Sequence, residues 1–248
     1  MLIVNADDWG RCVADTDAAR AVFVAGVVTS ATAMVYMADS RRAAAQALEL
    51  DLPVGLHINL TEPFSADHTP DRLKHEHEAI ATFLSRHRFS QLAYNPRLHA
   101  AFVRVVEAQL EEFRRLFGKE PTHFDGHEHM HLCANVLVSR PIPKGSRMRR
   151  TFSYSAGEKG MAKRIFRALV CRWMHQYYVQ TDYFFDLSER MAPSEFQGVC
   201  ALSRYSNVEL MCHPANDSNR DFLLSSRFEA AIRGLRLGSY RDLPYLGP

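Results

Sequence analysis

The chain begins with the apolar run Leu2-Ile3-Val4-Asn5-Ala6, which leads directly into Asp7-Asp8-Trp9-Gly10. Three later apolar runs end in the same way, at His57, at the segment Asp125-Gly126-His127 and at His213. Short runs of this kind predict buried strands. Parallel α/β folds place their chemistry at the carboxyl ends of strands. The carboxylates and imidazoles gathered there therefore predict a hydrolytic metal site.

Helical patterns occupy the segments between these runs. Helices are expected at about residues 15–25, 40–50, 96–117, 158–178, 193–202 and 222–235, and further strands at 27–34, 148–154 and 183–185. Strand followed by helix, repeated along the chain, predicts a parallel sheet with right-handed crossovers. A closed or partly closed (β/α) barrel explains best why four strand ends converge on one site. The expected fold class is therefore α/β and barrel-like, with an open doubly wound sheet as second choice.

Length and composition fit an ordinary globular protein. The chain has 248 residues, of which 47% are apolar and 23% charged, which is enough to bury a sizeable core. No domain boundary is visible, so we expect a single catalytic domain over residues 1–248. Residues 59–95 are mostly irregular, with a helical stretch at about 76–88. Their length predicts a substrate loop or lid.

Several function classes are disfavoured. The formal net charge of +2 and the absence of glycine-rich phosphate motifs give no support for nucleic-acid or nucleotide binding. The uncharged segment Ala21–Ala38 fits the end of a helix and a buried strand better than a membrane span. Five cysteines without a C-x-x-C pair, and no visible signal peptide, favour a cytoplasmic protein with reduced thiols.

Asp7 and Asp8 are the first candidate site residues. Neighbours on an ideal strand point to opposite faces, but a turn at Gly10 would let both carboxylates approach one cation. The natural division of labour is one metal ligand and one general base. A turn with two solvated aspartates is the alternative, because Asp is common in turns.

The cluster His123-x-Asp125-x-His127-x-His129-x-His131 is the densest set of ligand types in the chain. If the chain turns after Gly126, His127 and His129 would lie at the rim of the site. Asp125 or Glu128 could accept a hydrogen bond from an imidazole and fix its tautomer. A polar, solvent-facing strand end is the alternative.

Two isolated histidines complete the set, although each could equally be a satisfied core residue. His57 would join Asp8 and His127 in a metal site with one carboxylate, two imidazoles and open positions, which lowers the pKa of bound water. Asp7 could then take the proton from that water, and His213 could return one to the leaving group. Together these parts describe metal-assisted acyl hydrolysis.

Five segments together resemble the YdjC-like (ChbG/HpnK) carbohydrate deacetylase family: residues 4–10, 28–32, 55–62, 117–131 and 209–215. The resemblance implies a distorted TIM-type barrel related to polysaccharide deacetylases. It also implies a divalent cation and removal of an N-acetyl group from an amino sugar or oligosaccharide. By position, Asp8, His57 and His127 match the metal ligands of the family. Asp7 matches its proposed base and His213 its proposed acid.

The substrate stays open, because the chain departs from the family in the expected substrate loops. Gly126-His127 stands where many members have Ser-His, and residues 65–95 match no known pattern. The basic stretch from Arg140 to Arg150 is expected to be a solvated loop, with a contact surface for an anionic substrate group as the minority alternative.

The identity of the ion and two other functions are also open. One Asp and two His suit zinc, while magnesium, nickel, cobalt and manganese remain alternatives. A non-haem iron oxygenase is the alternative enzyme class, because His123-x-Asp125 with His213 mimics its ligand triad. A non-catalytic sugar-binding protein on the same fold is the third. The expected partner is an N-acetylated sugar, with no nucleic acid and no membrane span; a homodimer is an open question.

Overall fold

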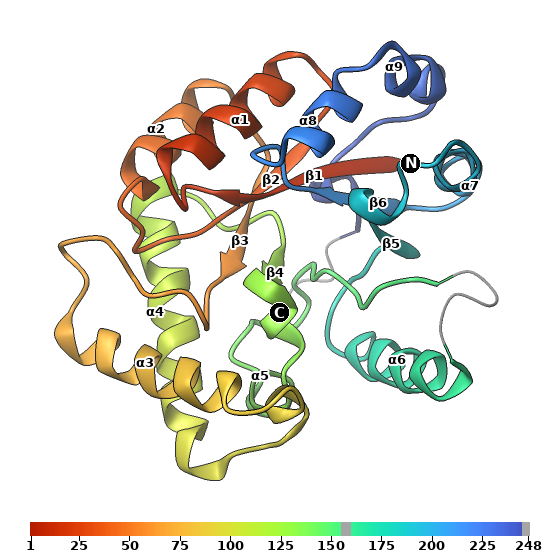
Figure 1. The fold of residues 1–248 in the computed structure, drawn as a ribbon. Helices are drawn as coiled ribbons and strands as arrows, with labels where there is room; N and C mark the ends of the chain where they lie inside the picture. Colours follow the sequence, from red (N-terminus) through yellow and green to blue (C-terminus); the bar gives the residue numbers. More distant parts are fainter. Residues whose placement is uncertain (155–159, 245–248) are drawn as a thin grey trace. The chain divides into compact units, whose positions relative to one another are not determined.

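A computed structural model describes residues 1–154 and 160–244, and helices alternate with strands along this part of the chain (Figure 1). The residues group into two compact units. Unit 1 comprises Met1–Asp7, Asp17–Ala31 and Lys144–Pro248, and unit 2 comprises Asp8–Thr16 and Thr32–Pro143. Strands β1 and β2 each contribute residues to both units.

Unit 1 is built on three neighbouring strands: β1 (Leu2–Trp9), β6 (Val208–Cys212) and β5 (Tyr183–Asp186). Strand β6 is the middle one and is parallel to both neighbours. Its register with β1 runs from Leu2 opposite Val208 to Ala6 opposite Cys212. Strands β1 and β6 are buried along their whole length, which explains why most of their residues are apolar.

The helices of unit 1 follow its strands. They are most of α1 (Val13–Val24), then α6 (Met161–Met174), α7 (Pro193–Ser203), α8 (Asp217–Leu223) and α9 (Ser226–Ile232), with short 3₁₀ turns at Leu187–Glu189 and Tyr240–Asp242. The expected helix 158–178 is confirmed as α6, and its first two residues lie outside the described part of the chain.

Unit 2 holds β3 (Val54–Ile58), which pairs in parallel with β4 (Phe124–Gly126) and has β2 (Ser30–Ala33) on its other side. Its helices are α2 (Ser40–Glu49), α3 (Asp71–Ser85), α4 (His99–Phe117) and α5 (Ala134–Ser139), with 3₁₀ turns at Ser90–Leu92, Pro96–Leu98 and His127–Leu132. Helix α4 ends at Phe117, as expected, and Gly118 follows it in the left-handed conformation.

The stretch at residues 59–95 is more ordered than its sequence suggests. Its helix α3 buries Leu73, His77, Ile80 and Leu84 and packs against α4. The helix also begins five residues earlier than expected, directly after Pro70. The spacing of these apolar residues is helical, but the many charged residues between them make the pattern hard to recognise in the sequence.

Two expected elements are wrong. Residues 148–154 form no strand; only an isolated bridge between Arg147 and Val179 occurs there. The helix expected at 222–235 has the wrong bounds: α9 covers only Ser226–Ile232, and Phe222 and Leu223 end the separate helix α8. The two helices separate because the side chain of Ser225 caps the second one by accepting a hydrogen bond from the Phe228 backbone. Helix α5 was not predicted.

The α/β class is confirmed by the parallel strand pairs and their alternation with helices. Segment 21–38 forms the end of α1 and then β2, as expected. Over the described residues, no helix combines the length and the apolar character that crossing a bilayer requires. All five cysteines are free thiols.

Candidate functional site

Asp8, His57 and His127 lie together in unit 2, as the sequence predicts. Asp8 comes from the end of β1, His57 from β3 and His127 from the turn that follows β4. Asp8 Oδ1 is 3.4 Å from Nε2 of His57 and 3.0 Å from Nδ1 of His127. One ligand atom from each residue lies within 4.8 Å of the others. Three donors at this separation can reach one small cation.

The backbone at Asp8 explains how consecutive aspartates acquire different surroundings. The backbone of Asp8 has a φ of 66°, which lies in the left-handed region that residues other than glycine rarely adopt. Such strain clusters at functional sites and costs roughly 1–3 kcal/mol. The strand therefore bends at Asp8, and its carboxylate faces His57 and His127.

Asp125 fixes the orientation of His57. Its Oδ1 lies 2.7 Å from Nδ1 of His57, and its Oδ2 accepts a hydrogen bond from the hydroxyl of Thr32 at 3.0 Å. All three side chains are buried. A ring held this way at Nδ1 presents Nε2 toward Asp8, which is the arrangement of metal-binding histidines supported by a carboxylate. The expected contact between Asp125 and an imidazole is confirmed.

The charge state of Asp8 suits a cation ligand. Burial alone would raise the pKa of Asp8, but hydrogen bonds from His127 and His57 outweigh it and hold that pKa well below its usual range. Asp8 is therefore an anion at neutral pH. An anionic oxygen and two imidazole nitrogens form a donor set that suits zinc and related divalent ions.

Two charged residues near this group were not among the predicted site residues. Arg11 Nη1 lies 3.4 Å from Asp8, and Glu62 Oε2 lies 3.3 Å from Nε2 of His127. Glu62 is partly exposed, so it sits at the solvent side of the group. Glu62 could have been found from the sequence because it ends the segment 55–62, which resembles the family. Nothing in the sequence marked Arg11 as a site residue.

The other histidines of the dense cluster do not join Asp8. The chain turns after Gly126, because Glu128 and His129 adopt left-handed backbone angles and end the alternation of the strand. His123 is buried against Gly55, where an added Cβ would lie 2.5 Å from the ring. His131 is buried in the same turn. The alternating pattern of five possible ligands in the sequence therefore predicted a larger group around Asp8 than the structure has.

Asp7 belongs to a buried charge cluster in unit 1. Its two carboxylate oxygens each accept a hydrogen bond of 2.7 Å from Arg149. Arg149 also donates to Glu209 at 2.8 Å, and Glu209 accepts a 2.5 Å bond from the hydroxyl of Tyr240. All four side chains are buried. Arg149 and Glu209 were missed, and the solvated-loop interpretation of residues 140–150 is wrong for Arg149, which is fully buried.

His213 follows β6 in unit 1 and is partly exposed. Its backbone N–H donates to the side chain of Asn219 at 3.1 Å, and Asn219 in turn donates to Ser188. These bonds fix the backbone at the strand end and leave the imidazole outside the network.

The fold and this site define the class: an α/β protein whose strand ends carry a carboxylate with two imidazoles. A family model described as "YdjC-like protein" matches residues 1–241. The chain therefore belongs to the YdjC-like protein family, as the sequence segments indicate.

Named relatives agree with this membership. A chitooligosaccharide deacetylase from Serratia marcescens is 29% identical over 270 residues, covering 98% of this chain and 99% of the relative. A carbohydrate deacetylase from Mus musculus is 36% identical over 143 residues, covering 54% of this chain. That match spans 44% of the mouse protein, less than half its length.

The fold also occurs in a solved structure. A putative cellobiose-phosphate cleavage protein from Enterococcus faecalis V583 superposes with a TM-score of 0.70, covering 97% of each chain at 19% identity. This likeness supports the fold.

Proposed function

We propose that this protein is a metal-dependent hydrolase that removes an N-acetyl group from an amino sugar or oligosaccharide. The observation that carries the proposal is the group of Asp8, His57 and His127, with Asp125 supporting His57. Membership of the YdjC-like family and relatives named deacetylases support the substrate class.

Asp8, His57 and His127 would hold the ion, with zinc as the expected metal and magnesium, nickel, cobalt and manganese as alternatives. A bound divalent cation would polarise the acyl oxygen and acidify a water molecule. The buried anion of Asp8 supplies the charge that such an ion requires, and the two imidazoles leave further positions open to water and substrate.

Asp7 acts as the general base in this proposal, and His213 as the general acid. Arg149 donates two hydrogen bonds to Asp7, which holds the carboxylate in one orientation. Histidine ionises near neutral pH, so His213 can return a proton to the departing amine. The partial exposure of His213 is compatible with this role.

Further parts of the proposal concern the whole chain. Residues 1–248 act as one catalytic domain with a distorted barrel-like fold, and the segment 59–95 acts as a substrate loop or lid. The protein works in the cytoplasm. Whether the protein forms a homodimer is tested by measuring its molar mass in solution by light scattering.

The proposal is tested by measuring acetate release from a panel of N-acetylated mono- and oligosaccharides, with and without a chelator. We expect release from at least one sugar, loss of release after chelation and recovery when zinc is returned. Full activity in the chelator would contradict the metal-dependent mechanism. A panel without any acetate release would contradict the substrate class.

The oxygenase alternative receives no support from the contacts of Asp125. Both oxygens of this carboxylate are engaged, one with His57 and the other with Thr32. Asp125 therefore supports a neighbouring imidazole.

A further inference from the structure

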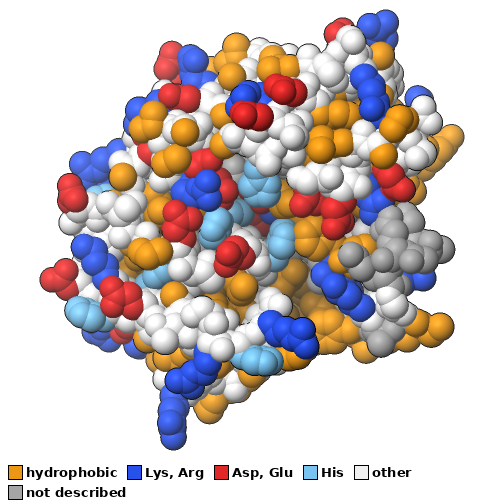
Figure 2. Space-filling view, viewed as in Figure 1, with side chains coloured by type: hydrophobic (Ala, Val, Ile, Leu, Met, Phe, Trp, Pro, Cys, Tyr) orange, Lys and Arg blue, Asp and Glu red, His pale blue; other side chains and the backbone are white. Residues whose placement is uncertain are grey.

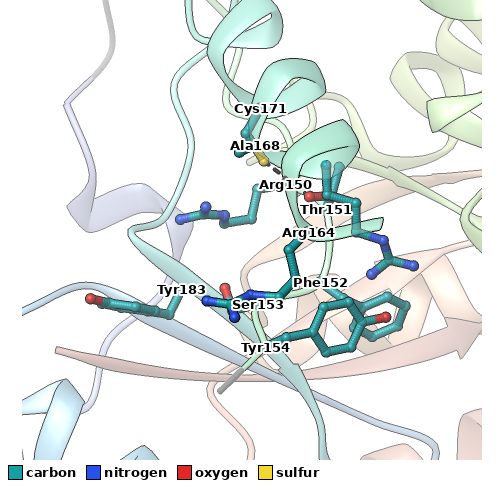
Figure 3. Close-up of a pocket in the computed structure, with 10 residues that line it drawn as sticks. Arg150, Thr151, Phe152, Ser153, Tyr154, Arg164, Ala168, Cys171 and Tyr183 are labelled. Carbon is teal, nitrogen blue, oxygen red and sulfur yellow. Dashed lines mark hydrogen bonds between the residues drawn. The ribbon is translucent and has the colours of Figure 1, made fainter. Parts of the chain in front are cut away.

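Unit 1 contains a pocket that the proposed hydrolysis does not use. It is a cavity of about 200 Å³ between the segment 150–154, helix α6 and the start of β5 (Figure 3). The lining residues that matter for its chemistry are Arg150, Arg164, Arg167, Phe152, Ser153 and Tyr154.

The pocket is strongly cationic. Three arginines line it, and none of the described residues that line it is an aspartate or glutamate. Over the described residues, Arg150, Arg164 and Arg167 form no ion pair with any carboxylate. This contrasts with Arg149, the next residue in the chain, which two carboxylates hold. Three guanidinium charges without acidic partners favour an anion.

Within the described part of the chain, two of these guanidinium groups have buried N–H groups without acceptors. Arg150 donates one bond, from Nη1 to the carbonyl of Thr181 at 3.3 Å, but its buried Nε has no acceptor among the described residues. Nη1 of Arg167 is also buried and lacks an acceptor there. A buried donor without an acceptor costs about 1–3 kcal/mol. An oxyanion in the pocket would remove this cost.

Aromatic rings hold the pocket in shape. The guanidinium of Arg167 lies 5.2 Å from the ring centre of Phe152 and 4.7 Å from that of Tyr154. Phe152 stacks on Phe184 with ring centres 4.7 Å apart. Phe184 also contacts Arg149, whose guanidinium lies 4.9 Å from the centre of the Phe184 ring. Arg167 is therefore pre-positioned by packing, which lowers the entropy cost of binding at this side chain.

We propose that this pocket binds a phosphate ester group. Three cationic side chains match the several anionic oxygens of a phosphate group better than a single carboxylate, and guanidinium groups bind phosphate oxygens in bidentate geometry. The hydroxyls of Ser153 and Tyr154 line the same cavity and add hydrogen-bond donors. The site is a binding site in its own right and does not depend on the proposed hydrolysis.

The phosphate can come from a soluble ester or from a lipid headgroup. Helix α6 gives the lipid source a structural basis. Met161, Ile165, Phe166 and Leu169 on this helix are between 49% and 77% exposed, and apolar side chains cover the α6 region in Figure 2. The helix carries four cationic residues and no acidic one. Basic helices with an exposed apolar face bind anionic membrane surfaces.

Direct binding measurements test the proposal on the full chain. The soluble probes are inorganic phosphate and glucose 6-phosphate, measured by isothermal titration calorimetry. The lipid probe is co-sedimentation with phosphatidylcholine vesicles, with and without phosphatidylglycerol. Arg164→Gln is the main variant, because the Arg164 side chain is exposed and makes no hydrogen bond or ion pair with any described residue that a substitution would break. Arg172→Gln is the matched control: it removes the same charge from α6 at an exposed position outside the pocket.

We expect Arg164→Gln to weaken binding about tenfold, since one charge-assisted hydrogen bond is lost, and Arg172→Gln to weaken it less than about twofold. Arg150→Gln should repeat the effect of Arg164→Gln. Binding of a soluble ester identifies a soluble phosphate ester as the ligand. Binding only to vesicles that contain phosphatidylglycerol identifies a lipid headgroup. Either result supports the site if Arg164→Gln weakens that binding.

Three results would overturn the proposal. They are no binding of any probe, wild-type binding by both pocket variants, and equal weakening by Arg164→Gln and Arg172→Gln. The last would mean that the overall charge of α6, rather than the pocket, attracts the anion. Since every readout is binding, failure here leaves the proposed deacetylation unaffected.

Discussion

Asp7 in unit 1 and Asp8 in unit 2 are consecutive in the chain, yet their carboxylates face opposite kinds of partner. Asp7 accepts two hydrogen bonds from Arg149, a group that is always a donor and always cationic. Asp8 faces two imidazoles, and Arg11 Nη1 lies 3.4 Å from it. Both oxygens of Asp7 are engaged by one buried guanidinium, whereas Asp8 belongs to a group of three side chains that can hold a cation together. Neighbours in sequence can thus have separate roles when the backbone bends between them.

The largest expected effect comes from removing the metal-facing carboxylate. Asp8→Asn should lose the bound ion and lower acetate release by about a thousandfold or more, because the donor set loses its only anion. Metal content by mass spectrometry and acetate release check this. Glu49→Gln, at an exposed carboxylate of α2 outside the segment 59–95, is the control and should retain both. Normal metal content in Asp8→Asn would remove Asp8 from the ligand set.

The second effect is on the stability of unit 1. Arg149→Met would leave the buried anions Asp7 and Glu209 without their shared cation, and should lower the free energy of unfolding by about 3–5 kcal/mol. Urea unfolding measures this, with Arg41→Met as an exposed control. An unchanged unfolding midpoint would mean that Arg149 does not compensate these carboxylates.

The third effect distinguishes a residue that binds the metal from one that only orients a metal-binding histidine. Asp125→Asn keeps Asp8, His57 and His127 but weakens the hold on the His57 ring, so metal affinity should fall about 10–100-fold. Competition with a chromophoric chelator measures the affinity. Thr32→Val, which removes only the outer hydrogen bond, should cost less. The idea of a supporting carboxylate fails if Asp125→Asn binds the ion as tightly as the native chain.

The smallest effect concerns pH and the helix α3. Burial lowers the pKa of His77 from its ordinary 6.5 to about 4. The unfolded chain therefore binds a proton more readily, so the contribution is present above pH 6.5 and is lost as the pH falls toward 4. Between about pH 7 and pH 5 the free energy of unfolding should fall by about 2 kcal/mol from this residue. His77→Phe should lose that part of the pH dependence; an unaltered pH profile would contradict it.

The strands and the metal-facing residues could be predicted because their signals are local. Buried parallel strands are continuous apolar runs, so the ends that carry Asp8, His57 and His127 are visible in the sequence. The role of Asp125 followed from the need of an imidazole for an acceptor. These inferences required only residue type and position along a strand.

The remaining features depend on contacts between distant residues. Arg149 and Glu209 are 60 positions apart and pair in the buried interior, so neither stands out from its neighbours in the sequence. The expected strand at 148–154 failed for a related reason: the chain there positions Arg149 rather than extending a sheet. The split between α8 and α9 depends on the cap at Ser225, which a helical pattern conceals.

The most direct test is anomalous X-ray scattering from crystals of the protein loaded with zinc. The account predicts one strong peak bonded to Asp8, His57 and His127, at about 2.0–2.2 Å from each ligand atom. A peak elsewhere in unit 2, or a fully loaded protein without density among these three side chains, would contradict it.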